Sequence, residues 1–180
     1  CLNKALNIRL SDVNIQKKSN DVTAPMTVDG SGDTTIELDG NNVLDAYTSS
    51  RTYAAGLEKK GTGTLTITDT DSITADGTQD NTLRGSLTAV GGWEQGAGIG
   101  SRSAYGAGPH DQTENITIAG NAYVNAWGRG NAAGIGGGQR GSGSHITISG
   151  GEVNASGGKC GAGIGGGHTG DGSDIKITGG

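Results

Sequence analysis

A short apolar–polar–apolar motif recurs along the chain at a nearly constant interval. Alternation with a period of two predicts a strand that buries one face. Neighbouring copies lie roughly 29 residues apart, except for one longer interval between the third and fourth copies, and such spacing is typical of repeat proteins whose copies stack. The inward pairs predicted from this motif are Ile8 and Leu10, Ile36 and Leu38, Leu65 and Ile67, Ile116 and Ile118, Ile146 and Ile148, and Ile175 and Ile177.

Two further motifs accompany this one. The first is the glycine-rich sequence Ala-Gly-Ile-Gly with its divergent copies, and its apolar position predicts one stacked rank of side chains: Met26, Leu57, Ile99, Ile135 and Ile164. The other has the form apolar–polar–Ala and occurs as Leu44-Asp45-Ala46, Ile73-Thr74-Ala75, Val124-Asn125-Ala126 and Val153-Asn154-Ala155. Each repeat therefore contains three short strands, and equivalent strands of successive repeats pair side by side.

The three motifs predict an all-β fold, a single-stranded right-handed parallel β-helix (solenoid) of about five coils, with three short strands in each coil of roughly 29 residues. The right hand follows from the preference of parallel crossovers. The composition agrees, because 37 glycines, no Phe and only 31% hydrophobic residues suit the thin core of a solenoid. We expect one β-helix domain over residues 1–180, as a piece of a longer surface protein.

Insertions and aromatic residues indicate where a ligand would bind. The long interval predicts insertions at residues 76–96 and 101–114, and insertions in solenoids gather on one face, which is often the binding face. Trp and Tyr rings stack on the apolar faces of sugars, while Arg bonds hydroxyl or carboxylate groups. The candidate ligand-binding residues are Trp93, Trp127, Tyr53, Arg84 and Arg129. A second interpretation stays open, in which the two Trp side chains only hold their loops in place.

The glycines of the first motif also need an explanation. The alternation places them on the outer face of the strand, at Gly98 and Gly100, Gly134 and Gly136, and Gly163 and Gly165. One interpretation is structural: a neighbouring segment packs on the strip, or the following turn needs a positive φ. The other is that a ligand or partner approaches the backbone there.

Charge and cysteine content restrict the partners. The net charge of −5 argues against nucleic acid, and no apolar run reaches the length of a membrane-spanning helix. We therefore expect no nucleic acid partner and no membrane insertion. Cys1 and Cys160 are far apart in a solenoid, so we expect no disulfide between them. We interpret Cys1 as the first residue of a mature or excised piece of a longer protein. The alternative is that Cys1 is the lipidated first residue of a lipoprotein.

No catalytic constellation is legible. Asp39 and Asp69 follow successive copies of the second motif, but glycines occupy the matching positions of later copies. We therefore predict no catalytic residues, no metal site and no cofactor. Calcium is the alternative, because Asp69 and Asp71, and likewise Asp171 and Asp174, supply the clustered oxygens that calcium prefers; the default role of Asp in turns competes with it.

With these motifs the chain resembles the pectate-lyase-like right-handed β-helices. More narrowly, it is similar to the glycine-rich carbohydrate-binding or adhesin-type repeats of secreted surface proteins of Gram-positive bacteria. The resemblance implies a non-catalytic, extracellular carbohydrate-binding or adhesion module, secreted or on the bacterial cell surface, whose partner is a glycan or a host surface glycoprotein. Two alternatives remain: a structural spacer that assembles by homotypic end-to-end stacking, and a calcium-dependent polysaccharide lyase.

Overall fold

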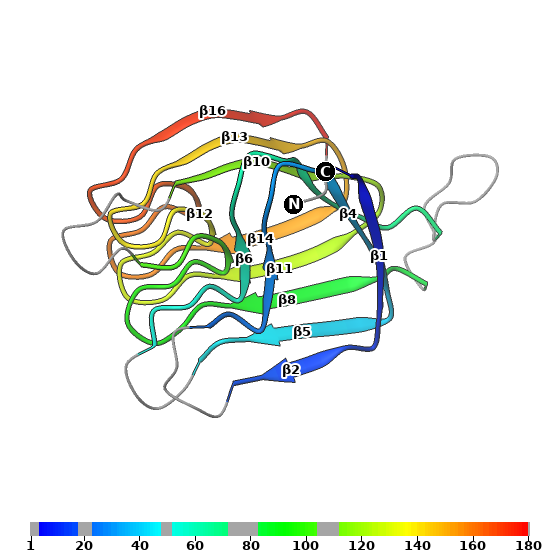
Figure 1. Cartoon of the computed structure of the whole chain (residues 1–180), viewed down its shortest axis with the longest axis horizontal. Coiled ribbons are helices and arrows are strands. Elements are labelled where there is room, and N and C mark those ends of the chain that lie inside the picture. The colour runs from blue at the N-terminus through cyan, green and yellow to red at the C-terminus, as the bar shows by residue number, and fades with distance from the viewer. Residues whose placement is uncertain (1–3, 18–22, 48–51, 72–82, 104–111, 180) are drawn as a thin grey trace.

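The chain winds through three parallel sheets in strict rotation. The computed structural model describes residues 4–17, 23–47, 52–71, 83–103 and 112–179 (Figure 1). These residues form sixteen strands and no helix. Each strand pairs in parallel with its equivalent one coil away, so strand β1 pairs with β4, β2 with β5 and β3 with β6. The arrangement is the predicted parallel β-helix solenoid.

Each sheet collects one of the three motifs. Sheet A contains β1 (Leu6–Ser11), β4 (Thr34–Asp39), β7 (Leu65–Thr68), β10 (Thr113–Ile118), β13 (Gly143–Ile148) and β16 (Gly172–Ile177). Sheet B contains β2 (Asn14–Gln16), β5 (Asn41–Asp45), β8 (Ser86–Val90), β11 (Tyr123–Trp127) and β14 (Glu152–Ser156). Sheet C contains β3 (Met26–Val28), β6 (Leu57–Lys59), β9 (Ile99–Gly100), β12 (Ile135–Gly136) and β15 (Ile164–Gly165).

The core is a narrow column of aliphatic side chains from all three sheets. In sheet C the predicted rank is confirmed, because Met26 pairs with Leu57, which pairs with Ile99, and the rank continues through Ile135 to Ile164. The middle members of this rank are fully buried. Burial of an Ile or Leu side chain stabilises the fold by roughly 1.5–3 kcal/mol, and no coil could achieve this burial without its neighbours.

The register between β4 and β7 differs from the prediction by two residues. Ile36 pairs with Ile67 and Thr34 pairs with Leu65, whereas the motif alignment had placed Ile36 opposite Leu65. A shift of two residues keeps the same side chains on the inner face, so it costs the core little. The same shift occurs between β5 and β8, where Leu44 lies opposite Ala89.

This shift places a polar residue in the core. Asn42 occupies the inward position equivalent to Leu87 and is 1% exposed. Its side-chain amide donates to the carbonyl oxygens of Asp39 and Ser86, both at 3.1 Å, and its Oδ1 accepts the Val13 N–H at 3.0 Å. Asn42 therefore links three successive coils through hydrogen bonds within the core.

The predicted insertion at 76–96 is wrong in its bounds. Ser86–Val90 forms strand β8, and Leu87 and Ala89 within it are fully buried core residues. The third strand of this coil is thus Leu87-Thr88-Ala89, and the alternative copy Ile73-Thr74-Ala75 lies outside the described residues. Both segments carry the same apolar–polar–Ala pattern, so the pattern could not distinguish them. The predicted insertion at 101–114 likewise includes Thr113 and Glu114, which belong to β10.

The glycine strip of sheet C is closed by the protein's own backbone. Gly98 is buried, and a Cβ atom built on it would lie 2.5 Å from the backbone nitrogen of Trp127. The glycines that follow the stacked isoleucines, Gly100, Gly136 and Gly165, have φ between +125° and +138°. Both features are backbone requirements, so the structural interpretation of these glycines is the one that the fold supports.

Candidate functional site

The outer face of sheet B carries most of the exposed aromatic and amide groups. Along β11, Val124 and Ala126 are fully buried, so Tyr123, Asn125 and Trp127 lie on the outer side. The backbone below them is held by pairing with β8 on one side and β14 on the other. Because a strand rises about 3.3 Å per residue, Tyr123 and Trp127 are roughly 13 Å apart along the strand. This face is long enough for a short oligosaccharide.

An aromatic cluster occupies the end of this face where the strands of sheet B terminate. The rings of Tyr47 and Trp93 are 5.3 Å apart at an angle of 48°, and the guanidinium carbon of Arg129 lies 4.9 Å from the centre of the Tyr47 ring. Trp93 and Trp127 are 50% and 45% exposed. We call Tyr47, Trp93, Trp127 and Arg129 the aromatic cluster. All three aromatic side chains of the cluster are partly exposed, Tyr47 by 36%.

Backbone hydrogen bonds hold these platforms in position. The N–H of Tyr47 donates to Asp45 Oδ1 at 2.8 Å, and the N–H of Trp93 donates to the hydroxyl of the fully buried Thr52 at 3.1 Å. The carbonyl oxygen of Trp127 accepts the Gly91 N–H at 2.9 Å. Trp93 and Trp127 are thus anchored to a neighbouring coil and Tyr47 to its own strand, and little ordering would be required on binding.

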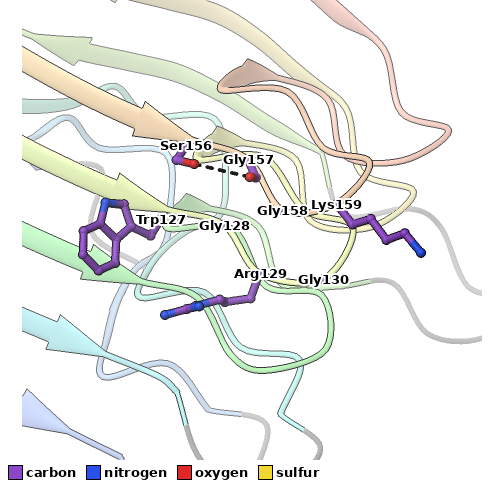
Figure 2. Close-up of a pocket in the computed structure, with 8 residues that line it drawn as sticks. All are labelled: Trp127, Gly128, Arg129, Gly130, Ser156, Gly157, Gly158 and Lys159. Carbon is purple, nitrogen blue, oxygen red and sulfur yellow. Dashed lines mark hydrogen bonds between the residues drawn. The ribbon is translucent and has the colours of Figure 1, made fainter.

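A groove of about 550 Å³ lies between two successive turns beside the cluster. Figure 2 shows Trp127 and Arg129 extending in the same direction from one turn, while Lys159 extends the opposite way from the next. The N–H of Gly128 donates to the carbonyl oxygen of Ser156 at 2.8 Å, which joins the two turns. The residues that line the groove are Trp127, Gly128, Arg129, Gly130, Ser156, Gly157, Gly158 and Lys159.

The opposite end of the sheet B face is a polar network. Arg84 stacks over the Tyr123 ring at 4.7 Å and its Nη2 donates to Glu152 at 3.0 Å. The side-chain amide of Asn154 donates to the Asn125 Oδ1 at 3.2 Å and lies 3.3 Å from the Tyr123 hydroxyl. This network joins three adjacent strands or turns. The network presents amide and hydroxyl groups on the same face as the aromatic cluster.

The structure brings four of the five predicted site residues to this one face. Trp127 and Arg129 belong to the cluster with Trp93, whereas Arg84 belongs to the polar end. Tyr53 is half-buried, and its carbonyl oxygen accepts the Ser103 N–H at 3.0 Å. The prediction missed Tyr47, although it directly follows Ala46 just as Trp127 follows Ala126, and this shared position was the available signal.

The elements that supply the cluster differ from those predicted. Trp93 lies in the short turn between β8 and β9, and Trp127 lies at the end of β11. Both positions are sheet-B-to-sheet-C connections of neighbouring coils, and Tyr47 follows β5 at the equivalent connection. The site is therefore a stack of equivalent turns, and a groove between two insertions is not what positions it.

Asp39, Asp69, Asp71 and Asp174, four of the carboxylates considered for calcium or catalysis, contact other residues of the protein. Asp39 and Asp71 both pair with Arg9, and the fully buried Asp69 accepts the Gly85 N–H at 2.8 Å. On the outer face of sheet A, Asp174 lies 3.4 Å from His145 Nε2. Among the described residues, no three His, Cys, Asp or Glu side chains are grouped to hold a metal ion. No helix in the described part of the chain could span a membrane.

Three stretches of the chain, residues 85–105, 116–139 and 146–168, match a family model described as a beta helix repeat. Each matched stretch ends just after a strand of sheet C. These matches and the parallel register together define the protein as a right-handed parallel β-helix. Comparison with curated proteins gave no match, and comparison with solved structures gave none either.

Proposed function

We propose that this β-helix is a non-catalytic carbohydrate-binding or adhesion module that works outside the cell, secreted or on a bacterial surface. The observation that carries the proposal is the aromatic cluster: Trp93 and Trp127 are half-exposed on an ordered face, next to Arg129. Sugar rings have apolar faces and polar edges, so they bind best where an aromatic platform lies beside hydrogen-bonding groups. Asn125 and Asn154 supply such groups on the same face.

The proposed partner is a glycan, free or on a host surface glycoprotein. The net charge of −5 disfavours nucleic acid as the ligand. Stacking and hydrogen bonding to a sugar need no cofactor, so the proposed mode works without calcium. β-helix repeats support both lyases and proteins without catalytic activity, and a lyase would need its catalytic groups elsewhere than in the aromatic cluster, which contains no carboxylate.

A glycan array tests this proposal. Wild-type protein should bind a defined subset of glycans, and Trp127→Ala and Trp93→Ala should each weaken binding, because the stacking of a sugar on the ring is lost with the ring. Trp127→Phe should retain most of the binding, since it keeps a platform. His145→Ala, on the outer face of sheet A, is the matched control and should bind as wild type does. Equal binding by wild type and both Trp→Ala variants would place the site elsewhere.

End-to-end assembly is the second candidate function. At the end of the core formed by β16, Ile177 is 64% exposed, although the equivalent Ile148 is 4% exposed. A groove of about 570 Å³ there is lined by Ile148, Val153, Ile164 and Ile177 among others. Such a surface fits either a second copy or further coils. Light scattering tests the first option: Ile177→Lys should convert a self-associated form to monomer, and a monodisperse wild-type monomer would count against it.

A further inference from the structure

The two arginines of the sheet B face differ in their electrostatic state. Arg84 donates to Glu152 at 3.0 Å, and its charge is thereby compensated. Arg129 has no carboxylate within ion-pair distance among the described residues. Its guanidinium group lies over the Tyr47 ring at 4.9 Å, and its Nε is buried without a hydrogen-bond partner. Arg129 is therefore an oriented cation with unused donors.

Within the part of the chain that the structure describes, no ion pair compensates the charge of Arg129. The lining of the adjacent groove includes Lys159 and contains no acidic residue. Two carboxylates lie in the neighbouring turns, Asp45 two residues before Tyr47 and Glu94 next to Trp93, and neither forms an ion pair with Arg129. A protein with an overall charge of −5 thus has a local positive site beside its aromatic cluster. Such a local charge attracts anionic groups.

The geometry also suits an anion held edge-on. When a guanidinium group stacks on an aromatic ring, its face is used by the ring while its N–H groups point outward in the guanidinium plane. This fork matches the two oxygens of a carboxylate or a sulfate ester. Figure 2 shows the Trp127 ring on the same side as the Arg129 side chain, so one sugar unit could stack on Trp127 while its acidic group reaches Arg129.

We propose that the ligand is an acidic glycan, whose carboxylate or sulfate group is bound by Arg129 beside the Trp127 platform. This inference rests on the proposed carbohydrate-binding function and specifies the chemical class of the glycan. Arg129 selects the charge, Trp127 supplies the stacking surface, and Lys159 adds to the attraction without a defined contact. Acidic glycans bind at least about tenfold more tightly than the same glycans without charge, which is typical for a hydrogen bond to a charged group.

The test compares matched pairs of immobilised glycans. The pairs are sialylated and desialylated N-acetyllactosamine, polygalacturonate and its methyl ester, and heparan sulfate and its desulfated form. The proteins are wild type, Arg129→Gln, Arg129→Lys and Arg140→Gln. Arg140→Gln is the matched control. Arg140 is exposed and lies in the turn after β12, and its substitution removes the same formal charge as Arg129→Gln. The readout is the ratio of the dissociation constants within each pair, measured at low and high salt.

We expect wild type and Arg140→Gln to prefer the acidic member of at least one pair about tenfold or more, with a preference that declines as salt is added. Arg129→Gln should abolish this preference, so that it binds the acidic and the neutral member of each pair with similar dissociation constants. Arg129→Lys should retain part of it, since the charge remains without the fork. A preference for the sialylated or uronate members identifies a carboxylate, and one for heparan sulfate alone identifies a sulfate.

Two results would overturn the inference, and they are distinguishable. If neutral glycans bind as tightly as their acidic partners, and Arg129→Gln behaves like Arg140→Gln, the acidic specificity is wrong while the carbohydrate-binding function stands. If wild type binds no member of any pair and nothing on a broader glycan array, the proposed function itself fails, and the inference fails with it.

Discussion

Gly136 lies so close to Gly165 of the next coil that a Cβ atom built on Gly136 would be 2.0 Å from the Gly165 carbonyl oxygen. Both residues have similar positive φ angles, +125° and +129°. At Gly165, however, the nearest atom to a new Cβ would be the Ile175 side-chain methyl at 3.4 Å. A side chain at Gly165 would therefore meet only the unfavourable φ, whereas a side chain at Gly136 would meet both the unfavourable φ and a collision with backbone.

Alanine at these two positions should destabilise the fold to different extents. Gly165→Ala should cost about 1–3 kcal/mol, because a residue with a side chain is strained at that φ. Gly136→Ala should cost about 1–3 kcal/mol more, because the new methyl group also collides with backbone that has no space to move. Urea unfolding monitored by circular dichroism measures both. Equal losses for the two variants would show that the close approach contributes nothing.

Asn42 should be among the most sensitive polar positions. Asn42→Ala removes three hydrogen bonds and leaves half-buried backbone groups of Val13 and Ser86 without these partners, so we expect a loss of about 2–4 kcal/mol in the free energy of unfolding. Asn41→Ala, on the adjacent exposed position, should cost less than about 1 kcal/mol. Asn42→Leu should not restore stability, because it leaves the same backbone groups unpaired. A stable Asn42→Leu variant would contradict this account.

Lys59 makes stability depend on pH. It is 2% exposed, and burial lowers its pKa below the ordinary value of 10.5, with Glu114 and Asp29 opposing the shift. Its Nζ donates to the carbonyl oxygens of Lys60 and Gly61 at 3.0 and 2.7 Å. Between the lowered pKa and 10.5 the unfolded chain binds more protons than the folded protein, so the free energy of unfolding should rise with pH across that window.

The contribution of Lys59 is the difference between the pH dependence of stability in wild type and in Lys59→Met. Urea unfolding of wild type and Lys59→Met over the alkaline range should show an additional positive slope in wild type, of at most about 1.4 kcal/mol per pH unit. Lys159→Met, which removes an exposed lysine, should keep the wild-type slope. If wild type and Lys59→Met have parallel pH profiles, the Lys59 pKa is not shifted.

Calcium should affect neither stability nor glycan binding. Asp39 and Asp71 are paired with Arg9, whose positive charge disfavours a cation there, and Asp69 accepts the Gly85 N–H. Thermal unfolding in EDTA and in calcium chloride should give the same Tm, and glycan binding should be equal in both. A Tm that rises with calcium concentration would indicate a bound ion. Arg9→Gln is the informative variant, because it frees Asp39 and Asp71 and should create calcium dependence if their geometry permits.

Much of the fold could be predicted because each coil repeats the same local pattern. The rank from Met26 to Ile164 was correct in every member, because the glycine-rich motif and its divergent copies mark the apolar position in each coil. The prediction failed where two segments shared one pattern: Leu87-Thr88-Ala89 and Ile73-Thr74-Ala75 are equivalent by sequence, and only the pairing of β8 with β11 distinguishes them. The β4–β7 shift was missed for the same reason.

The candidate site was predictable in composition but not in its arrangement. Trp93, Trp127 and Arg129 were identified because aromatic and arginine side chains in turns are unusual in a chain with so few large residues. Their convergence with Tyr47 depends on the stacking of equivalent turns, and the sequence analysis had assigned Trp93 to an insertion. The different states of Arg84 and Arg129 depend on Glu152, which lies two strands from β8 in sheet B, so no local pattern could reveal them.

The sequence by itself determined the architecture of this protein: the approximate period, three strands in each coil and the inward rank of sheet C. This was possible because the alternation of apolar and polar residues is a local pattern that recurs in each coil. Only the tertiary structure decided which turns meet, that the glycine strip is closed by backbone, and that Arg129, beside Trp127, forms no ion pair with any residue that the structure describes. These features depend on contacts between residues in different coils, and such contacts exist only once the coils have stacked.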